Sequence, residues 1–257
     1  MNKLIAGSFL AFSTLMVGCT NTDDDDPAQS SDFATSAIDA FYYFEVDSNN
    51  GVAFRVNFEH DDKSLKLDGG DSAQVVSGDD THSLSEVQSG GTVSYVANVD
   101  EGSTLPANYQ FQLLRDSQQD SDNSFVTMPI SFDVNSPTTD STISATNNRY
   151  FTINWDDNGS DNARFDLRFD FNCSRIDGTS AVSSSRTYES VTDNGSYQVD
   201  LLDVVGNNSI QVCNDFDITA WRIRTGALDL ANLNGGSIRG AQVRQVLNLM
   251  IENIDLQ

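Results

Sequence analysis

Two acidic stretches offer the chemistry of a cation site. Calcium takes about six to eight oxygen ligands from carboxylates and carbonyls on tight loops. Neither stretch matches the EF-hand pattern, and Asp is also a common turn residue. Specific calcium binding and plain solvated turns therefore both stay open, and the sequence predicts no other cofactor. The candidate calcium ligands are Asp116, Asp120 and Asp122 in the first stretch, and Asp156, Asp157 and Asp161 in the second.

Two cysteines late in the chain, Cys173 and Cys213, are candidates for a disulfide. In an oxidising compartment a pair of thiols forms a disulfide more readily than a metal site. The pairing closes a loop of about 40 residues, for which the chain-entropy model gives roughly 4 kcal/mol. The alternative is two free, buried thiols.

The residue types of a catalytic centre are scarce. The only histidines are His60 and His82, each beside acidic residues, and we expect both on solvated loops. A general base needs a partner and an oriented substrate, and no Gly-x-Ser-x-Gly nucleophile elbow is present. The sequence therefore predicts a protein that is not an enzyme. A hydrolase stays as an alternative that requires a Ser-His or carboxylate pair converging in a deep cleft.

The first nineteen residues have the pattern of an export signal. Lys3 is followed by an apolar run from Leu4 to Val17, which is shorter than the roughly 20 residues of a membrane-spanning helix. The run ends in Leu15–Cys19, which resembles the lipobox of bacterial lipoproteins. That resemblance implies cleavage before Cys19 and acylation of its thiol. Thr20, rather than Asp, follows the cysteine, and among Gram-negative lipoproteins this implies the outer membrane.

The charge of the chain restricts its partners. The net charge is −24, and Asp provides most of the 38 acidic residues. Such a chain is repelled by nucleic acid and by anionic membrane surfaces, so we expect no nucleic-acid partner. We interpret the acidity as adaptation to salty surroundings. The segment 19–31, with four consecutive aspartates, has no apolar face and reads as a disordered, lipidated tether.

Apolar residues from about position 37 onward recur at every second position. Two examples are the run from Val52 to Phe58 and the run from Phe165 to Cys173, each alternating with polar residues. This period is typical of strands that are half-buried in a sandwich. Clusters of Gly, Asn, Asp and Ser separate the runs and predict turns. Together they predict an all-β fold of antiparallel β-sandwiches.

The runs 54–62 and 151–157 each lead from an aromatic strand into an acidic turn, which indicates an internal repeat. We therefore predict two tandem domains divided near Pro137. The predicted parts are a signal peptide at 1–18, the tether at 19–31, a first β-sandwich at 32–137 and a second at 138–257.

The segment 240–254 has two interpretations. As a helix it places Val243 and Leu247 on one face; as a strand it places Val243, Leu247, Leu249 and Ile251 inward, with Arg244 outward. The surrounding pattern is β throughout, so we predict a strand.

Two sandwiches with an inward Trp155 are similar to tandem immunoglobulin or fibronectin type III domains. Trp155 precedes both Cys173 and Cys213, whereas a true immunoglobulin domain has its tryptophan between the paired cysteines. The stretch from Arg224 to Ile238 also resembles an element of uncharacterised lipoproteins from marine Gram-negative bacteria. That resemblance implies no known activity.

We therefore expect a non-catalytic envelope lipoprotein that acts in adhesion, assembly or recognition. Its partners are the membrane, through the lipid, and an unidentified protein or glycan at the cell envelope. A carbohydrate-binding protein or an accessory to polysaccharide uptake is the alternative, with Trp221 and the pair Tyr42 and Tyr43 as its only aromatic platform. We expect core packing for these three side chains.

The lipid anchor yields the first testable prediction. Cys19→Ser removes the thiol that is acylated, so the protein leaves the membrane fraction and incorporates no labelled palmitate. Fractionation of cells that express each form measures the change, and Cys213→Ser serves as a control that keeps the label. Membrane retention of Cys19→Ser would contradict the prediction.

Overall fold

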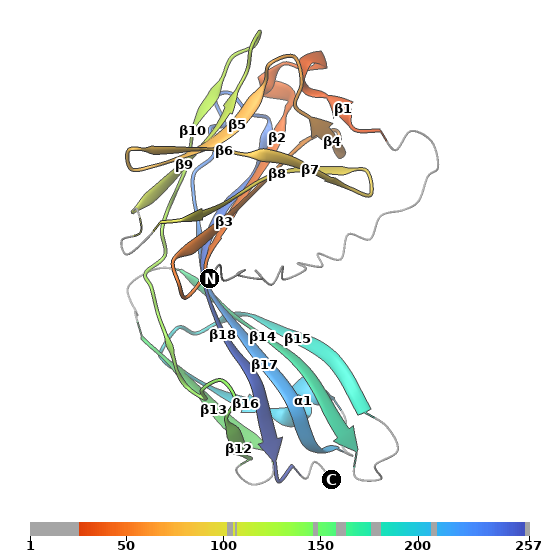
Figure 1. Ribbon diagram of the computed structural model, residues 1–257, viewed down its shortest axis with the longest axis vertical. Helices are drawn as coiled ribbons and strands as arrows, with labels where there is room; N and C mark the ends of the chain where they lie inside the picture. The colour runs from red at the N-terminus through yellow and green to blue at the C-terminus, as the bar shows by residue number, and fades with distance from the viewer. Residues whose placement is uncertain are drawn as a thin grey trace, which may run out of the picture.

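A computed structural model describes residues 26–101, 105, 107–145, 149–157, 163–175, 181–206 and 210–254. Cys19 and the predicted signal peptide lie outside these residues. Figure 1 shows two β-rich bodies, one above the other, with the first strands in the upper body and β12 to β16 in the lower one. No helix in the described ranges is long and apolar enough to span a membrane.

One large sheet runs through both bodies. Within the described residues it has eleven strands, and its main path follows the order β1-β4-β3-β2-β18-β17-β14-β15. Off this path, β8 pairs with β3, β7 pairs with β8, and β12 pairs with β18. Its strands are β1 (Ala28–Gln29), β2 (Asp39–Val46), β3 (Gly51–His60), β4 (Lys63–Lys66), β7 (Ser85–Ser89), β8 (Thr92–Asp100), β12 (Thr142–Ser144), β14 (Arg164–Arg175), β15 (Ala181–Val191), β17 (Ile210–Thr225) and β18 (Gly235–Glu252).

Two smaller sheets provide the other layer of each body. In the upper body the order is β10-β9-β5-β6, and in the lower body it is β11-β13-β16. These strands are β5 (Ser72–Ser77), β6 (Asp80–Ser83), β9 (Asn108–Leu114), β10 (Ser121–Thr127), β11 (Val134–Ser136), β13 (Tyr150–Trp155) and β16 (Ser196–Asp200). Helix α1 (Leu201–Val205) follows β16, and Asp200 caps its first turn by accepting from the backbone of Leu202. Short 3-10 turns at Ser30–Asp32 and Thr35–Ala37 lead into β2.

Alternation along the strands produces two buried apolar clusters in the described part of the chain. In β3, Val52, Phe54, Val56 and Phe58 are all buried in the upper cluster. In β14, the run from Phe165 to Cys173 is buried in the lower one, and Trp155 joins it as expected. The predicted all-β class is confirmed. Most strand pairs are antiparallel, but β2 and β18, β1 and β4, and β12 and β18 run parallel.

Strand β18 takes part in both bodies. Its residues 235–242 pair with 39–46 of β2, and its later residues pair with β17 down to Ile251. The last segment of the chain therefore supplies Leu233 and Ile238 to the upper core, a connection that the predicted division near residue 137 did not include. Gly236 makes the close approach feasible, because a Cβ there would lie 1.9 Å from the carbonyl oxygen of Ala40 and its φ is +118°.

The segment 240–254 is a strand, as predicted, but the predicted orientation of some of its side chains was wrong. Leu249 and Ile251 are buried as expected, whereas Leu247 is exposed and Arg244 is buried. The reason is an irregular register between β17 and β18, together with a left-handed Asn248 at φ +57°. This bulge shifts the alternation by one residue, so the inward side changes along the strand.

The folded part begins before the end of the predicted tether. The tether was expected to extend to residue 31, yet Ala28 and Gln29 pair with Leu65 and Lys66 of β4. Ser30 is fully buried. Polar contacts and two partly buried side chains, Ala28 and Phe33, hold this segment, and so short a segment shows no alternation of apolar residues.

The disulfide between Cys173 and Cys213 is present, as predicted. The two residues are partners on the adjacent strands β14 and β17, and both are fully buried in the lower core. The bond therefore joins strands that hydrogen bonds already hold together.

Loss of this bond should destabilise the protein. The double variant Cys173→Ala/Cys213→Ala opens a loop of 40 residues in sequence separation, so we expect the free energy of unfolding to fall by up to about 4 kcal/mol. Urea denaturation measures the change, and the wild type in reducing agent should behave as the variant does. An unchanged unfolding midpoint would refute the expectation.

Candidate functional site

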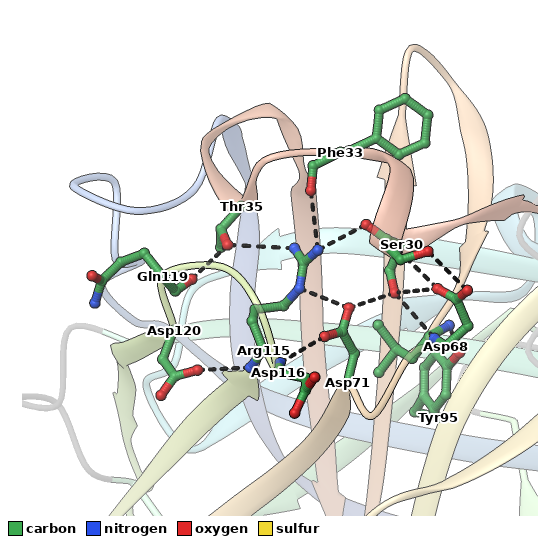
Figure 2. Close-up of polar contacts among 12 residues, drawn as sticks. Ser30, Phe33, Thr35, Asp68, Asp71, Tyr95, Arg115, Asp116, Gln119 and Asp120 are labelled. Atoms are coloured by element: carbon green, nitrogen blue, oxygen red, sulfur yellow. Dashed lines mark hydrogen bonds and ion pairs between the residues drawn. The ribbon is translucent and has the colours of Figure 1, made fainter.

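A buried ion pair fixes the start of the folded chain to the upper body. The Nε of Arg115 lies 2.7 Å from Oδ2 of Asp71, and these side chains are 0% and 4% exposed. The same guanidinium donates to the carbonyl oxygens of Ser30 and Phe33 at 2.7 and 3.0 Å, and to the hydroxyl of Thr35 at 3.3 Å (Figure 2). One side chain that follows β9 thus holds three residues of the first folded segment.

Asp68 strengthens this attachment from the other side. Its carboxylate accepts hydrogen bonds from the backbone and hydroxyl of Ser31, both at 2.9 Å, and from the hydroxyl of Ser30 at 3.2 Å. These bonds hold the pKa of Asp68 below its usual value, with the Ser31 backbone bond as the main cause. We name the contacts of Arg115, Asp71 and Asp68 with residues 30–35 the N-terminal clamp.

A second arginine cluster lies where the chain passes between the two smaller sheets. Arg222 of β17 has a fully buried side chain and pairs with Asp193 at 2.8 Å. It also donates to the carbonyl oxygens of Ile130 and Asp156, and its guanidinium lies 4.7 Å from the ring of Phe132. A buried charge is stable only when paired and hydrogen-bonded, and Arg222 meets both conditions.

Arg244 on the neighbouring strand β18 holds the same connecting segment. It lies 3.2 Å from Asp133 and donates to the hydroxyl of Ser131 at 2.9 Å. The two arginines therefore fix the connection between β10 and β11 against the large sheet. Their role in this structure is to join the two bodies.

The aromatic side chains that the sequence offered as a glycan platform are divided between two faces of the large sheet. Tyr42 is 2% exposed and lies in the upper core. Tyr43 and Trp221 come together on the other face, where both donate to Oε1 of Glu45, the indole at 3.0 Å. Trp221 is only 8% exposed, so its ring does not form an open stacking surface. Core packing was therefore the right expectation for Tyr42 and Trp221, while Tyr43 is half-buried.

We expected both histidines on solvated loops, and this was wrong: both lie in strands. His60 ends β3, and its Nδ1 lies 2.7 Å from the carbonyl oxygen of Ala37. His82 of β6 lies 3.0 Å from the hydroxyl of Ser77, which donates to Glu101 at 3.1 Å. The hydrophobic pattern could not place them, because both strands end in polar turns.

Ser77, His82 and Glu101 do not have the geometry of a catalytic triad. A triad acid binds the ring nitrogen opposite the serine, whereas here Ser77 and Glu101 both face Nε2 of His82. Ser77 is also 2% exposed, so a substrate carbonyl has no access to its hydroxyl. The group is a polar contact between β6 and the end of β8.

The candidate calcium ligands act mainly as partners of the backbone. Asp120 accepts from the backbone of Arg115 at 2.6 Å, and Asp156 accepts from the backbone of Asp133 and from the side chain of Asn135. The bond from Asn135 is the main cause of a lowered pKa at Asp156. Asp116 and Asp122 are exposed.

Asp157 is also exposed, and Asp161 lies outside the described residues. Among the residues that the structure describes, no three His, Cys, Asp or Glu side chains lie close enough together to hold a metal ion.

The candidate functional site is the outer edge of β15. This strand of eleven residues pairs with β14 on one side and ends the main path of the large sheet, and within the described ranges no strand pairs with its other side. Figure 1 shows it at the right margin of the lower body. Its central residues 183–187 are exposed on both faces, because the smaller sheet of three strands does not cover it.

The end of the edge strand borders an open depression of about 500 Å³. Tyr188 and Tyr197 lie beside it with ring centroids 6.0 Å apart. Burial raises the pKa of both phenols, and Asp203 raises it further, so the hydroxyls remain donors. The lining residues are Ser190, Val191, Thr192, Asn194, Ser196, Tyr197 and Gln198.

The other face of the same edge is acidic. Asp170 of β14 pairs with Asp217 of β17, and Asp215 lies one position further along the same face. Burial raises the pKa of Asp217, as do the charges of Asp215 and Asp170, while the backbone of Asn248 lowers it. Arg168 on the same face forms an ion pair with Asp170 at 2.7 Å, so the negative charge that an added segment meets here comes mainly from Asp215 and Asp217.

The comparisons with known proteins found no sequence match, and the solved structures align with this chain at low scores. No family model matches the chain, and no curated protein matches it. A DUF4785 family protein from Legionella pneumophila aligns at 10% identity and a TM-score of 0.25, over 70% of this chain and 51% of that one. Domains of titin align at 6% identity and a TM-score of 0.23, over 82% of this chain and 66% of the titin fragment. The adhesin InvE of Yersinia pseudotuberculosis aligns at 10% identity and a TM-score of 0.20, over 81% of this chain and 58% of the adhesin.

The chain thus spans about half of the DUF4785 protein and just under two thirds of the titin fragment. At these scores the alignments carry no argument about activity, partners or cellular location.

The N-terminal clamp yields a stability prediction. Arg115→Met leaves the buried Asp71 without its ion pair, which typically costs about 3–5 kcal/mol. We expect a loss of this size in urea denaturation and faster proteolysis within residues 28–37. Arg55→Met, at an exposed position of β3, is the matched control and should change little. Equal stability of the two variants would show that the clamp has no energetic role.

Proposed function

We propose that this protein is a lipid-anchored, non-catalytic recognition protein of the bacterial envelope that binds an extended segment of a partner protein along the edge of β15. The observation that carries the proposal is the open edge itself: a strand of eleven residues, eight of them exposed, at the margin of the large sheet. Such edges pair with an added strand through backbone hydrogen bonds.

The position of the edge suits an anchored protein. The lipid on Cys19 would attach the chain through its N-terminal side, and the N-terminal clamp fixes that side to the upper body. Strand β15 lies in the lower body, away from β1 (Figure 1). Because β18 pairs in both bodies, the clamped segment in the upper body and the edge in the lower body are connected through continuous strands.

The chemistry of the edge selects the partner. Backbone pairing gives affinity without sequence preference, and the side chains next to the added strand give specificity. Asp215 and Asp217 favour basic side chains on one face, where Arg168 already pairs with Asp170. On the other face, the half-buried Tyr188 and Tyr197 favour apolar ones. We therefore expect a segment in which basic and apolar residues alternate.

Site-specific photo-crosslinking in intact cells tests this function. A benzophenone side chain at position 184 of β15 should form a covalent adduct with a defined envelope protein. The same group at position 88, in the fully exposed strand β7, should not. Ser185→Lys places a positive charge on the edge and opposes pairing with a basic segment, so we expect it to reduce the adduct at least about tenfold.

Gln88→Lys is the matched control and should leave the adduct unchanged. Equal adducts from positions 184 and 88, or an adduct that Ser185→Lys does not affect, would refute recognition by strand addition. Loss of membrane association in Cys19→Ser would test the anchor separately.

A further inference from the structure

The large sheet has an outer face in the upper body, opposite the face that forms the upper core. Along β2, Tyr42 and Phe44 are buried in that core. Successive side chains of a strand point to opposite faces, so Phe41 and Tyr43 lie on the outer side. Phe41 is 37% exposed and Tyr43 is half-buried. Solvent therefore reaches the outer face at the centre of the upper sheet.

Two arginines lie on either side of Tyr43 on this outer face. Tyr43 is the cross-strand partner of Arg55 on β3 and of Arg239 on β18. Paired positions share a face, and adjacent strands are about 4.8 Å apart, so the backbones of β3 and β18 are separated here by about 10 Å. Both arginines are exposed, and neither forms an ion pair with another described residue. We call these three residues the arginine row.

The positions around the arginine row carry no acidic side chain, although the chain has 38 of them. The row continues through Val96 and Ser85 beyond β3, and through Thr225 beyond β18. The next outward positions along β3, β2 and β18 are Asn57, Phe41 and Ser237, which also pair with one another. These two neighbouring rows therefore carry two positive charges and no negative one.

The carboxylates that the same strands place on this face are engaged or distant. Glu45 accepts hydrogen bonds from the phenol of Tyr43 and from the indole of Trp221, and so fixes the tyrosine ring. Asp39 and Glu59 pair with each other four residues from the arginine row, which is about 13 Å along a strand. Charges at that distance are largely screened, because the Debye length at physiological salt is about 8 Å. A ligand at the arginine row thus meets positive charge in spite of the acidity of the whole chain.

The chemistry of the arginine row fits an acidic polysaccharide. A guanidinium group binds a carboxylate through two parallel hydrogen bonds, and two separated guanidinium groups fit a ligand whose carboxylate repeats. Aromatic rings offer a flat apolar surface, and Phe41 and Tyr43 stand at consecutive outward positions of β2. A sugar ring has an apolar face and a rim of hydroxyl groups. A chain of uronic acids therefore supplies partners for both the arginines and the aromatic rings.

We propose that the outer face of the upper body binds a polysaccharide of uronic acids along the arginine row. Arg55 and Arg239 bind carboxylates of two sugars, and Phe41 and Tyr43 contact the rings. Glu45 positions Tyr43 through their hydrogen bond. This site lies on strands of the upper body and is separate from the edge of β15, so it gives the protein a second partner that does not depend on strand addition.

Isothermal titration calorimetry of the full-length protein with polygalacturonate and with alginate tests this site. We expect at least one of the two to bind, with a dissociation constant that rises with sodium chloride because salt screens exposed charges. Methyl-esterified polygalacturonate has the same sugar backbone without the charge and should not bind. Polyglutamate has carboxylates but no sugar rings, so it should bind at least about fivefold more weakly.

Single variants locate the binding. Arg55→Gln and Arg239→Gln each remove one charged contact, so each should raise the dissociation constant about tenfold. Phe41→Ala should weaken binding of the polysaccharide and leave that of polyglutamate unchanged. Lys63→Gln is the matched control, because it removes an equal charge from an exposed position of β4 and should change neither.

Three results would overturn the proposal: no binding of either polysaccharide, equally tight binding of polyglutamate, or binding that survives in the double variant Arg55→Gln/Arg239→Gln. Vesicles that contain phosphatidylglycerol provide a fourth test. If the protein binds these vesicles and neither polysaccharide, the arginine row serves a membrane surface and the proposal is wrong.

Discussion

The backbone hydrogen bonds of β18 are the constraint on which the rest of this structure depends. The strand has eighteen residues, and it pairs with β2 in the upper body and with β17 through the lower one. Because one strand contributes to both cores, the two bodies share an uninterrupted sheet. Each of the two small sheets covers one part of the large sheet. The fold is therefore a long sheet with two separate covers, in which β18 connects the two sandwiches.

Buried charged side chains lie where connecting segments cross the sheets. Arg115 fixes the first folded segment, and Arg222 and Arg244 fix the connection between the two covers. Asp229 lies where the segment 226–234, which joins β17 to β18, crosses β10. These crossings expose carbonyl groups that no sheet partner satisfies, and an arginine can donate to several of them at once. In this protein the interior arginines thus replace hydrogen bonds that β-structure cannot supply.

One edge of the large sheet, the outer edge of β15, has no partner strand within the described residues. The lower cover has three strands opposite a wider sheet, and the central residues 183–187 of β15 are exposed on both faces. Natural sheets usually protect such an edge with lysine, proline or a bulge. Here the protection is limited to Arg186 at the centre and the left-handed Ser190 near the end. A chain of strong negative charge that resists self-association by repulsion can keep such an edge accessible for recognition.

The sequence by itself determined the all-β class, the buried faces of β3 and β14, and the pairing of Cys173 with Cys213. These depend on local alternation and on a count of thiols, both of which are visible along the chain. Only the tertiary structure decided that β18 belongs to both bodies, that Arg244 turns inward, and that Tyr43 meets Trp221 at Glu45. The sequence pattern marked the loop around Asp120 and Asp122 as rich in oxygen ligands, yet the bulge points Ser121 and Ser124 inward instead. Parallel pairing, bulges and crossings join residues up to about two hundred positions apart, and a period of two carries no information about which distant strand will be the neighbour.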